Sequence, residues 1–568
     1  MIDTVKLTLQ QELMEQLKER YSLVIPVVVE EPKRPEMGDL SVPVFSIVKS
    51  LGRPLSGVVQ EITELIRSSS VSQYIGSINP EGGFINLRLD RLTLAKAIIK
   101  TFQSEKSYGS SMVGNGEVIA IDYSSPNIAK PFSIGHLRST IIGHAIGNCL
   151  EKCGYKVIRI NHLGDFGTQF GKIIYSYLHF GNKEAVKANP IPELVKLYVE
   201  FHERAKDQPD MEEEARKIFK ELEQGNKEYH DLWSWFREVS LEDYLKVYQL
   251  LRVSFDSYDG EAFYNDKMQP VIDELQEKGL LIEDEGAMIV PLEEGTPPAL
   301  IQKTDGSTLY ITRDLAAFFY RKQVYQANKV LYVVGNEQKL HFQQLAQVIE
   351  KMGYPYAKDI IHVNFGLVLQ DGKKMSTRKG KIVRLEDVLR EAIRLSREYI
   401  EEKNPDLAEK ELIAEKVGVS AIIFNDLKNY RGNDFEFNLE DSVNFFGQTG
   451  PYLQYTSVRI KSIFAEDTFV FDGKIDLNWF GSDDVFDMVK TISFYPGIIQ
   501  RCVQEYAPSI LAKYLLTLAT QFNSFYGKEK ILVSDRIERH TKLHLCRMIE
   551  FVIDDGMRLL GMQIIEKM

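Results

Sequence analysis

Between residues 118 and 160 the hydrophobic residues first form a short continuous run, as in a buried strand, and then recur with the period of a helix. The run Val118–Asp122 (VIAID) is apolar up to a final carboxylate, a pattern typical of a buried parallel strand. From Gly135 the apolar residues recur at helical spacing, and Gly154 marks the end of that helix. Val157–Ile160 has the pattern of a second strand. This order predicts the βαβ unit of a nucleotide-binding α/β fold.

The residues before this unit predict a smaller α/β domain. Val5–Leu17 has helical spacing, and Leu23–Val29 has the pattern of an extended segment. A second helix is expected over Val44–Leu51, and Phe84–Leu89 alternates like a strand. We therefore assign residues 1–108 to an N-terminal α/β domain.

The residues after the βαβ unit complete an α/β multidomain protein. From about 185 to 295 the sequence is charged and helical in period, as an insertion between two halves of the sheet would be. Strand-like patterns resume in Thr308–Ile311, Val330–Val334 and Ile360–Leu369, and amphipathic helices predominate beyond about 385. We expect a Rossmann-like parallel-sheet catalytic domain over 109–384, with the helical insertion inside it, and an all-α helix bundle over 385–568.

Composition adds little to this outline but excludes some classes of protein. The chain has 568 residues, enough for three or more domains, and 4 cysteines, too few for a disulfide framework. Cys149 and Cys153 lie four apart without partnering Cys or His, so packing is favoured over metal binding. The N-terminal segment lacks the apolar core of a signal peptide, and no apolar run reaches the roughly 20 residues of a membrane span. We expect a cytoplasmic protein with no membrane partner.

The net charge of −12 leaves a nucleic-acid partner open. Phosphate binding uses clustered Lys and Arg, so an acidic chain argues weakly against such a partner. Net charge is a global sum, however, and an acidic protein can carry a local basic patch.

The loop between the first strand and its helix has the features of a phosphate-binding site. The free N–H groups of a helix N-terminus point out of its positive end, where a phosphate can bind. Gly135 lets a nucleotide approach the backbone closely, His136 adds a hydrogen-bond donor and Lys130 adds a positive charge. An ordinary strand-to-helix connection explains this segment equally well.

A second segment concentrates positive charge. Five cations fall within the nine residues 373–381, a stretch that also contains a glycine. Lys374, Arg378 and Lys379 could clamp a polyphosphate on such a loop. Taken alone, a basic run of this kind is more often a solvated loop.

Together the two segments resemble the HIGH and KMSKS signatures of class I aminoacyl-tRNA synthetases. Longer stretches are similar specifically to arginyl-tRNA synthetases and keep that family's order along nearly the whole chain: SSPNIAKPFSIGHLRSTIIG, INHLGDFGTQFG, LYITRDLAAFFYR, VVGNEQKLHF and TGPYLQYTSVRI. The insertion (LYVEFHERA, WSWFREVSL) and the C-terminal end (DDGMRLLGM) are similar as well. The resemblance implies an ATP-dependent ligase that activates L-arginine and transfers it to the 3′-terminal ribose of tRNA(Arg).

The resemblance also assigns residues to the two small substrates. A guanidinium is a planar fork of donors that carboxylates hold well. The positions that match the family's arginine pocket are Asp122, Asn127, Tyr310, Asp314 and Gln338. Those that match its ATP site are Ser133, Gly135, His136, Lys374, Met375, Ser376 and Arg378. The residues implied to stabilise charge on the phosphates are His136, Lys130, Lys374 and Ser133.

The partners follow from the same resemblance. ATP is expected with its Mg²⁺ as a substrate complex, with no tightly bound cofactor and no metal held by the protein itself. The N-terminal domain resembles one that contacts the corner of the tRNA, and the C-terminal helices resemble an anticodon-binding domain. There Tyr452 and Tyr455 could stack on bases and Arg459 could meet a phosphate, although aromatic residues at this spacing more often serve helix packing. We expect a monomer.

Three residues depart from the family's pattern. Ser133 replaces the first His of HIGH and cannot carry a charge, and Thr377 replaces the second Lys of KMSKS, a change familiar in arginyl enzymes. Asp122 stands where Glu is usual and is one methylene shorter. These departures leave room for a divergent paralogue that binds tRNA or activates arginine for another purpose. A small-molecule nucleotidyltransferase is the remaining alternative, but such an enzyme has no use for a long helical C-terminal domain.

Overall fold

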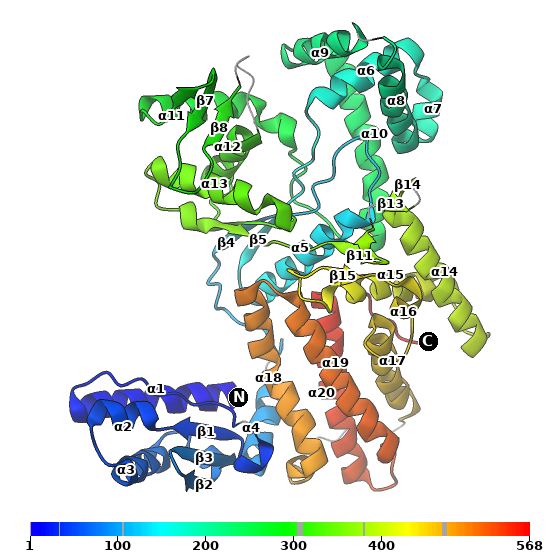
Figure 1. Cartoon of the computed structure of the whole chain (residues 1–568). Coiled ribbons are helices and arrows are strands. Elements are labelled where there is room, and N and C mark those ends of the chain that lie inside the picture. Colours follow the sequence, from blue (N-terminus) through cyan, green and yellow to red (C-terminus); the bar gives the residue numbers. More distant parts are fainter. Residues whose placement is uncertain are drawn as a thin grey trace.

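The computed structural model describes residues 2–568 except 33, 105–106, 209, 304–309, 376, 379–380 and 468–473. Figure 1 shows a small N-terminal domain at the lower left, a central parallel sheet, a helical insertion at the upper right and a group of long C-terminal helices below the sheet. The chain therefore has the multidomain α/β architecture that the sequence predicts, with the sheet between the insertion and the C-terminal helices.

The N-terminal domain is a three-stranded antiparallel sheet packed with helices. Its central strand β3 (Phe84–Leu89) lies between β1 (Leu40–Pro43) and β2 (Ile75–Glu81). The helices are α1 (Ile2–Tyr21), α2 (Phe45–Leu51), α3 (Leu55–Ser68) and α4 (Arg91–Ser104). The predicted helices and the predicted strand β3 are confirmed, whereas residues 23–29 run without regular secondary structure.

The central sheet has four parallel strands in the order β10-β9-β4-β5. Their bounds are Val118–Asp122 for β4, Lys156–Ile160 for β5, Lys329–Tyr332 for β9 and Ile360–His362 for β10. Helix α5 (Ile134–Lys152) connects β4 to β5, so the predicted βαβ unit is confirmed. Strand β4 is central, and the carboxyl ends of the parallel strands form one edge of the sheet, the usual place for a ligand in such folds.

The strand expected over Thr308–Ile311 is wrong. Tyr310 and Ile311 begin helix α12 (Tyr310–Gln323), and Thr308 lies outside the described residues. A short apolar run has no period long enough to separate a strand from the first turn of a helix, and burial of α12 against its neighbours decides the outcome here.

The single strand expected over residues 360–369 is two strands in different sheets. β10 ends at His362, and β11 (Val368–Gln370) pairs with β12 (Lys373–Lys374) and β15 (Phe435–Glu436). Between them the chain approaches another backbone closely: the Gly366 N–H donates to the carbonyl of Arg431 (2.9 Å), and a Cβ at Gly366 would collide with Asn433.

The insertion between β5 and β9 is helical only in its first part. Helix α6 packs against α8 and α9, so this helical part begins before residue 185. Its helices are α6 (Thr168–Phe180), α7 (Lys183–Ala188), α8 (Pro190–Ala205), α9 (Asp210–Glu223), α10 (Lys227–Leu251) and, later, α11 (Met268–Glu277). The expected helical character fails between 282 and 290, where an antiparallel sheet begins, of order β6 (Ile282–Asp284), β7 (Ala287–Val290) and β8 (Ala299–Gln302). Helix α13 (Lys339–Lys351) follows β9.

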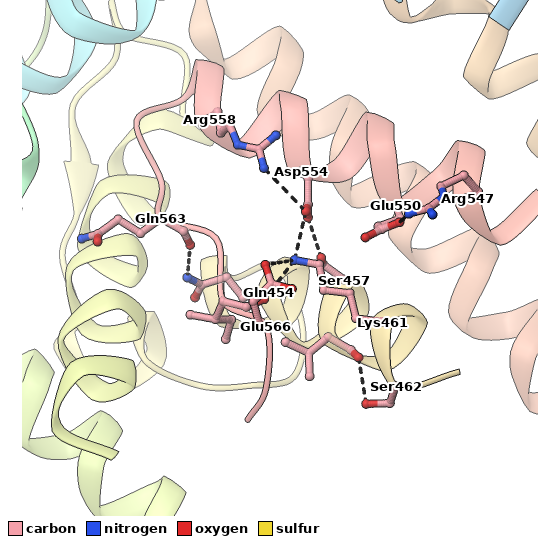
Figure 2. Close-up of polar contacts among 12 residues, drawn as sticks. Gln454, Ser457, Lys461, Ser462, Arg547, Glu550, Asp554, Arg558, Gln563 and Glu566 are labelled. Atoms are coloured by element: carbon pink, nitrogen blue, oxygen red, sulfur yellow. Dashed lines mark hydrogen bonds and ion pairs between the residues drawn. The ribbon is translucent and has the colours of Figure 1, made fainter. Parts of the chain in front are cut away.

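The C-terminal part consists mainly of helices, as the sequence predicts. They are α14 (Leu385–Lys403), α15 (Lys410–Leu427), α16 (Leu439–Ser442), α17 (Gly450–Glu466), α18 (Asp483–Glu505), α19 (Pro508–Lys528) and α20 (Arg536–Leu559). The last residues of the chain cross back over this group. Figure 2 shows Lys461 of α17 reaching both Asp554 of α20 (3.1 Å) and Glu566 of the C-terminal tail (2.9 Å).

In the described part of the chain, no helix combines the length and the apolar character that a membrane crossing needs. The four cysteines are buried and form no disulfide. Cys149 lies on α5 and its Sγ is 3.6 Å from that of Cys502 on α18, so the cysteines contribute to packing between these helices.

Candidate functional site

The N-terminus of α5 lies at the carboxyl edge of the sheet and is shaped by Ser133 and His136. Ser133 is the residue that caps the helix, and its backbone N–H donates to Nδ1 of His136 (3.0 Å). Because Nδ1 accepts this bond, the neutral ring carries its proton on Nε2, where it can be donated. Burial lowers the pKa of His136 to about 4, so the ring is neutral near pH 7. The site therefore offers a hydrogen-bond donor and not a positive charge at this position.

The helix end beside His136 is open. Gly135 is exposed, and a Cβ at this position would meet nothing closer than Ser133 Oγ at 3.5 Å. The free N–H groups of the first turn are therefore accessible to an anion.

The loop between β4 and α5 is held in an unusual backbone conformation. Ser124, Ser125 and Ala129 all have positive φ (72°, 47° and 58°), a conformation that costs energy in residues other than glycine. Hydrogen bonds maintain it: the Ser124 N–H donates to Ser139 Oγ (2.8 Å), and the Tyr244 hydroxyl donates to the carbonyls of Asn127 (2.6 Å) and Lys130 (2.7 Å). From this fixed loop the side chains of Asn127 and Lys130 are exposed.

A second group of expected residues lies at the starts of α12 and α13. Tyr310 is 67% exposed at the start of α12, and Asp314 follows one turn later. Asp314 Oδ2 lies 2.6 Å from Nε2 of His341 in the first turn of α13. Burial tends to raise the pKa of Asp314, but the bond from His341 and the neighbouring charges outweigh it and lower the pKa below its ordinary value. Gln338 is exposed just before α13. The ionised Asp314 is thus held at an accessible position.

Asp122 differs from the other expected arginine contacts because its carboxylate is already bonded. Oδ2 lies 2.7 Å from Nη2 of Arg321, Oδ1 accepts from Ser125 Oγ (2.9 Å), and the residue is 6% exposed. Arg321 itself is fully buried and lies over the ring of Tyr332, with 5.2 Å from Cζ to the ring centroid. Sequence analysis gave no indication of this pair, because Arg321 lies 199 residues after its partner.

The basic segment meets the α5 end through the backbone that follows it. Ser133 forms a bridge with Arg384, and the Leu385 N–H donates to the Phe132 carbonyl (2.9 Å). Lys374 is exposed on β12, whereas Met375 is 7% exposed and anchors the segment through its N–H to the Val368 carbonyl (2.8 Å). Ser376 and the side chain of Arg378 lie outside what the structure describes. The two segments that carried the resemblance are therefore neighbours in the fold.

The third group of expected residues lies far from this edge, on α17. The Arg459 guanidinium stacks between two tyrosine rings, 4.6 Å from the Tyr455 centroid and 5.1 Å from that of Tyr526, and donates to the Tyr455 hydroxyl (3.0 Å). Tyr455 is 37% exposed. Tyr452, one turn earlier, lines a surface cavity of about 590 Å³ together with Lys513 of α19. These residues form one polar and aromatic face, but they do not contact the α5 site.

No group of three or more His, Cys, Asp or Glu side chains within the described ranges is arranged to hold a metal ion. A Mg²⁺ ion typically keeps several waters and binds through substrate phosphates and one or two carboxylates.

Comparison with known proteins gives three family matches along the chain. Residues 6–89 match the model described as arginyl tRNA synthetase N terminal domain, residues 98–439 the model for class I (R) tRNA synthetases, catalytic domain, and residues 453–568 the DALR anticodon binding domain.

Full-length relatives agree with these matches. The arginine–tRNA ligase of Exiguobacterium sibiricum is 47% identical over 100% of this chain and 98% of its own length. That of Enterococcus faecalis is 47% identical over 96% of each chain. Among solved structures, the arginyl-tRNA synthetase from Plasmodium falciparum is similar with a TM-score of 0.81, at 26% identity, over 100% of this chain and 99% of that one.

Proposed function

The chain belongs to the arginyl-tRNA synthetase family, and from that membership we propose which of its residues perform each step of the reaction. It is a class I aminoacyl-tRNA synthetase, an ATP-dependent arginine–tRNA ligase whose substrates are arginine, ATP and tRNA. Neither the divergent paralogue nor the nucleotidyltransferase alternative gains support.

Residues 109–384 are proposed as the catalytic domain, with the inserted region over about 185–295. The N-terminal domain, 1–108, and the C-terminal helices, 385–568, are proposed to bind tRNA(Arg). Tyr452, Tyr455 and Arg459 are our candidates for its anticodon region, because an exposed tyrosine beside a guanidinium suits a base next to a phosphate.

ATP is proposed to bind with its phosphates at the open N-terminus of α5. The expected contacts are Ser133, Gly135, His136, Lys374, Met375, Ser376 and Arg378. His136 donates from Nε2 as a neutral ring, so positive charge comes from the exposed Lys130 and Lys374. The arginine carboxylate attacks the α-phosphate of ATP, pyrophosphate leaves, and a ribose hydroxyl at the tRNA 3′ end then takes the arginyl group from the adenylate. Catalysis in this scheme is positioning and stabilisation of phosphate charge, without a protein nucleophile.

Arginine is proposed to bind with its guanidinium at Asp314 and Tyr310, with Asn127 and Gln338 holding the rest of the molecule. Asp314 supports this assignment because its carboxylate is ionised and partly exposed. Both carboxylate oxygens of Asp122 already have partners, Arg321 and Ser125. Asp122 is therefore proposed to contact arginine indirectly, through Arg321 or through a water.

Mg²⁺ is proposed to enter with ATP, with no tightly bound cofactor. We also propose that the enzyme works as a monomer in the cytoplasm.

The observation that carries the residue assignment is the backbone pairing of Ser133 with Arg384, which joins the first signature segment to the residues just after the second. Aminoacylation of tRNA(Arg) by a His136→Ala variant tests it. The loss of one donor to the phosphates is expected to lower kcat by about 10²- to 10³-fold. His230→Ala, which removes an exposed histidine on α10, is the matched control and should charge tRNA at the parent rate. A His136→Ala variant with the parent kcat would refute the assignment.

A further inference from the structure

The residue that fixes the proposed arginine-binding carboxylate is a histidine outside the expected site. His341 and Asp314 lie on different helices, α13 and α12, and are joined by the 2.6 Å contact between Nε2 and Oδ2. Their side chains are 21% and 26% exposed, so the pair lies at the wall of the site and not in the core.

This contact leaves one face of the carboxylate available. Among the described residues, no hydrogen bond or ion pair reaches Oδ1 of Asp314, while Oδ2 is bonded to His341. A carboxylate only accepts hydrogen bonds, so Nε2 of His341 is the donor. A carboxylate held through one oxygen keeps a single orientation, and a substrate guanidinium can then bind the other oxygen without first ordering the side chain.

We propose that His341 is a positioning residue for arginine: its Nε2–H orients the Asp314 carboxylate so that Oδ1 faces the substrate guanidinium. The proposal rests on the assignment of Asp314 to the arginine pocket. His341 lies three residues after Gln338, so the segment that leads into α13 and the first turn of α13 would together supply a direct contact and the group that aligns Asp314.

Other charged and titratable groups face the pair from each neighbouring element. They are His162 after β5, Arg321 of α12, Tyr332 of β9, Glu261 within the insertion, between α10 and α11, and His362 of β10. Burial raises the pKa of Glu261 to about 7, so this carboxyl also titrates near neutral pH. The kinetic constants of the variants are therefore compared at one fixed pH.

The test compares His341→Ala, His341→Gln and Asp314→Asn by steady-state aminoacylation with purified full-length enzyme and tRNA(Arg). Gln places an amide N–H close to the position of the imidazole Nε2 and does not titrate. At pH 8 we expect His341→Ala to raise KM for arginine by about tenfold to a hundredfold, with kcat and KM for ATP and tRNA near the parent values. His341→Gln should restore KM for arginine to within about threefold of the parent.

Gln343→Ala, on the exposed face of the same helix, is the matched control, and thermal unfolding confirms that each variant is folded.

The outcomes separate the two proposals. An unchanged KM for arginine in folded His341→Ala, or no restoration of that KM by His341→Gln, overturns the role of His341. The assignment of Asp314 to the pocket still stands in that case if Asp314→Asn raises the KM for arginine. An unchanged KM for arginine in Asp314→Asn overturns the pocket assignment itself.

Discussion

The Nε of Arg138 lies 3.2 Å from Oδ2 of Asp426, and the two side chains are only 1% and 2% exposed. Arg138 belongs to α5, the helix whose N-terminus is the proposed phosphate site, and Asp426 belongs to α15 in the C-terminal part. Arg138 Nη1 also donates to the carbonyls of Gly366 (2.8 Å) and Asn433 (3.0 Å). The buried guanidinium of Arg138 therefore links α5 to three other segments of the chain, those that contain Gly366, Asp426 and Asn433.

Removing Arg138 should destabilise the protein strongly. Arg138→Met leaves Asp426 buried without its counter-charge, and such a loss costs about 3–5 kcal/mol. The thermal midpoint should fall by several degrees. Because a chain of this size need not unfold in one step, the midpoints of the variants are compared under identical conditions. Arg397→Met, which removes a pair exposed at 56% and 70% between α14 and α15, is the control and should cost less than about 1 kcal/mol. Equal shifts in the two variants would contradict this account.

His144 should make stability depend on pH. Burial lowers the pKa of His144 to about 4, below its ordinary value of about 6.5. Between pH 4 and 6.5, His144 binds a proton in the unfolded chain but not in the folded chain. The free energy of unfolding is therefore highest above pH 6.5 and decreases as the pH falls towards 4. At pH 5 the loss is about 2 kcal/mol. His144→Gln should show a flatter fall of the thermal midpoint between pH 7 and 5; a parallel fall would rule out His144 as the cause.

Gly164 should be required for arginine binding although it offers no side chain. A Cβ at this position would collide with the Oδ1 of Asn127 and lie 3.2 Å from its Cα. Gly164→Ala should therefore displace Asn127 and raise KM for arginine by about tenfold or more, with KM for tRNA little changed. Gly527→Ala, in a helix position where a Cβ meets nothing within 4 Å, is the control. If Gly164→Ala keeps the parent KM, Asn127 is not an arginine contact.

The stability that Lys461 of α17 contributes should come more from its buried partner than from its exposed one. Lys461 contacts Asp554, which is 9% exposed, and Glu566, which is 77% exposed (Figure 2). Asp554→Asn leaves a nearly buried ammonium with less charge compensation, and we expect a loss of about 2–4 kcal/mol; Glu566→Gln should cost less than about 1 kcal/mol. Thermal unfolding of both variants distinguishes them, and a larger effect at Glu566 would contradict this interpretation.

The sequence predicted the parts of the fold whose pattern is long and regular. Helix α5 and the helices of the C-terminal part were predicted because their apolar positions keep one period over many residues, and β4 was predicted because its apolar run leads directly into the loop before α5. Tyr310 and Ile311 were assigned to the wrong element because three or four apolar residues have no measurable period. The chain between 360 and 369 was misassigned because a backbone approach at Gly366 interrupts it, and the partner residue, Arg431, is distant in sequence.

The site was predicted only as far as local motifs reach. The loop around Asn127 and the α5 end could be proposed as site segments from the sequence because each lies within one continuous segment. Arg321 and His341 were missed, since an isolated Arg or His in a helix carries no signal until its carboxylate partner is known.

The most direct test of the account is charging of tRNA(Arg) with radiolabelled arginine by the wild-type enzyme beside a Ser133→His variant. Ser133 stands where the family has histidine; its backbone N–H, which the variant keeps, bonds Nδ1 of His136 at 3.0 Å, and its Oγ lies 3.2 Å from the same atom. We predict robust charging by the wild type, changed by less than about tenfold in the variant. No charging by either protein, with tRNA binding intact, would contradict the account.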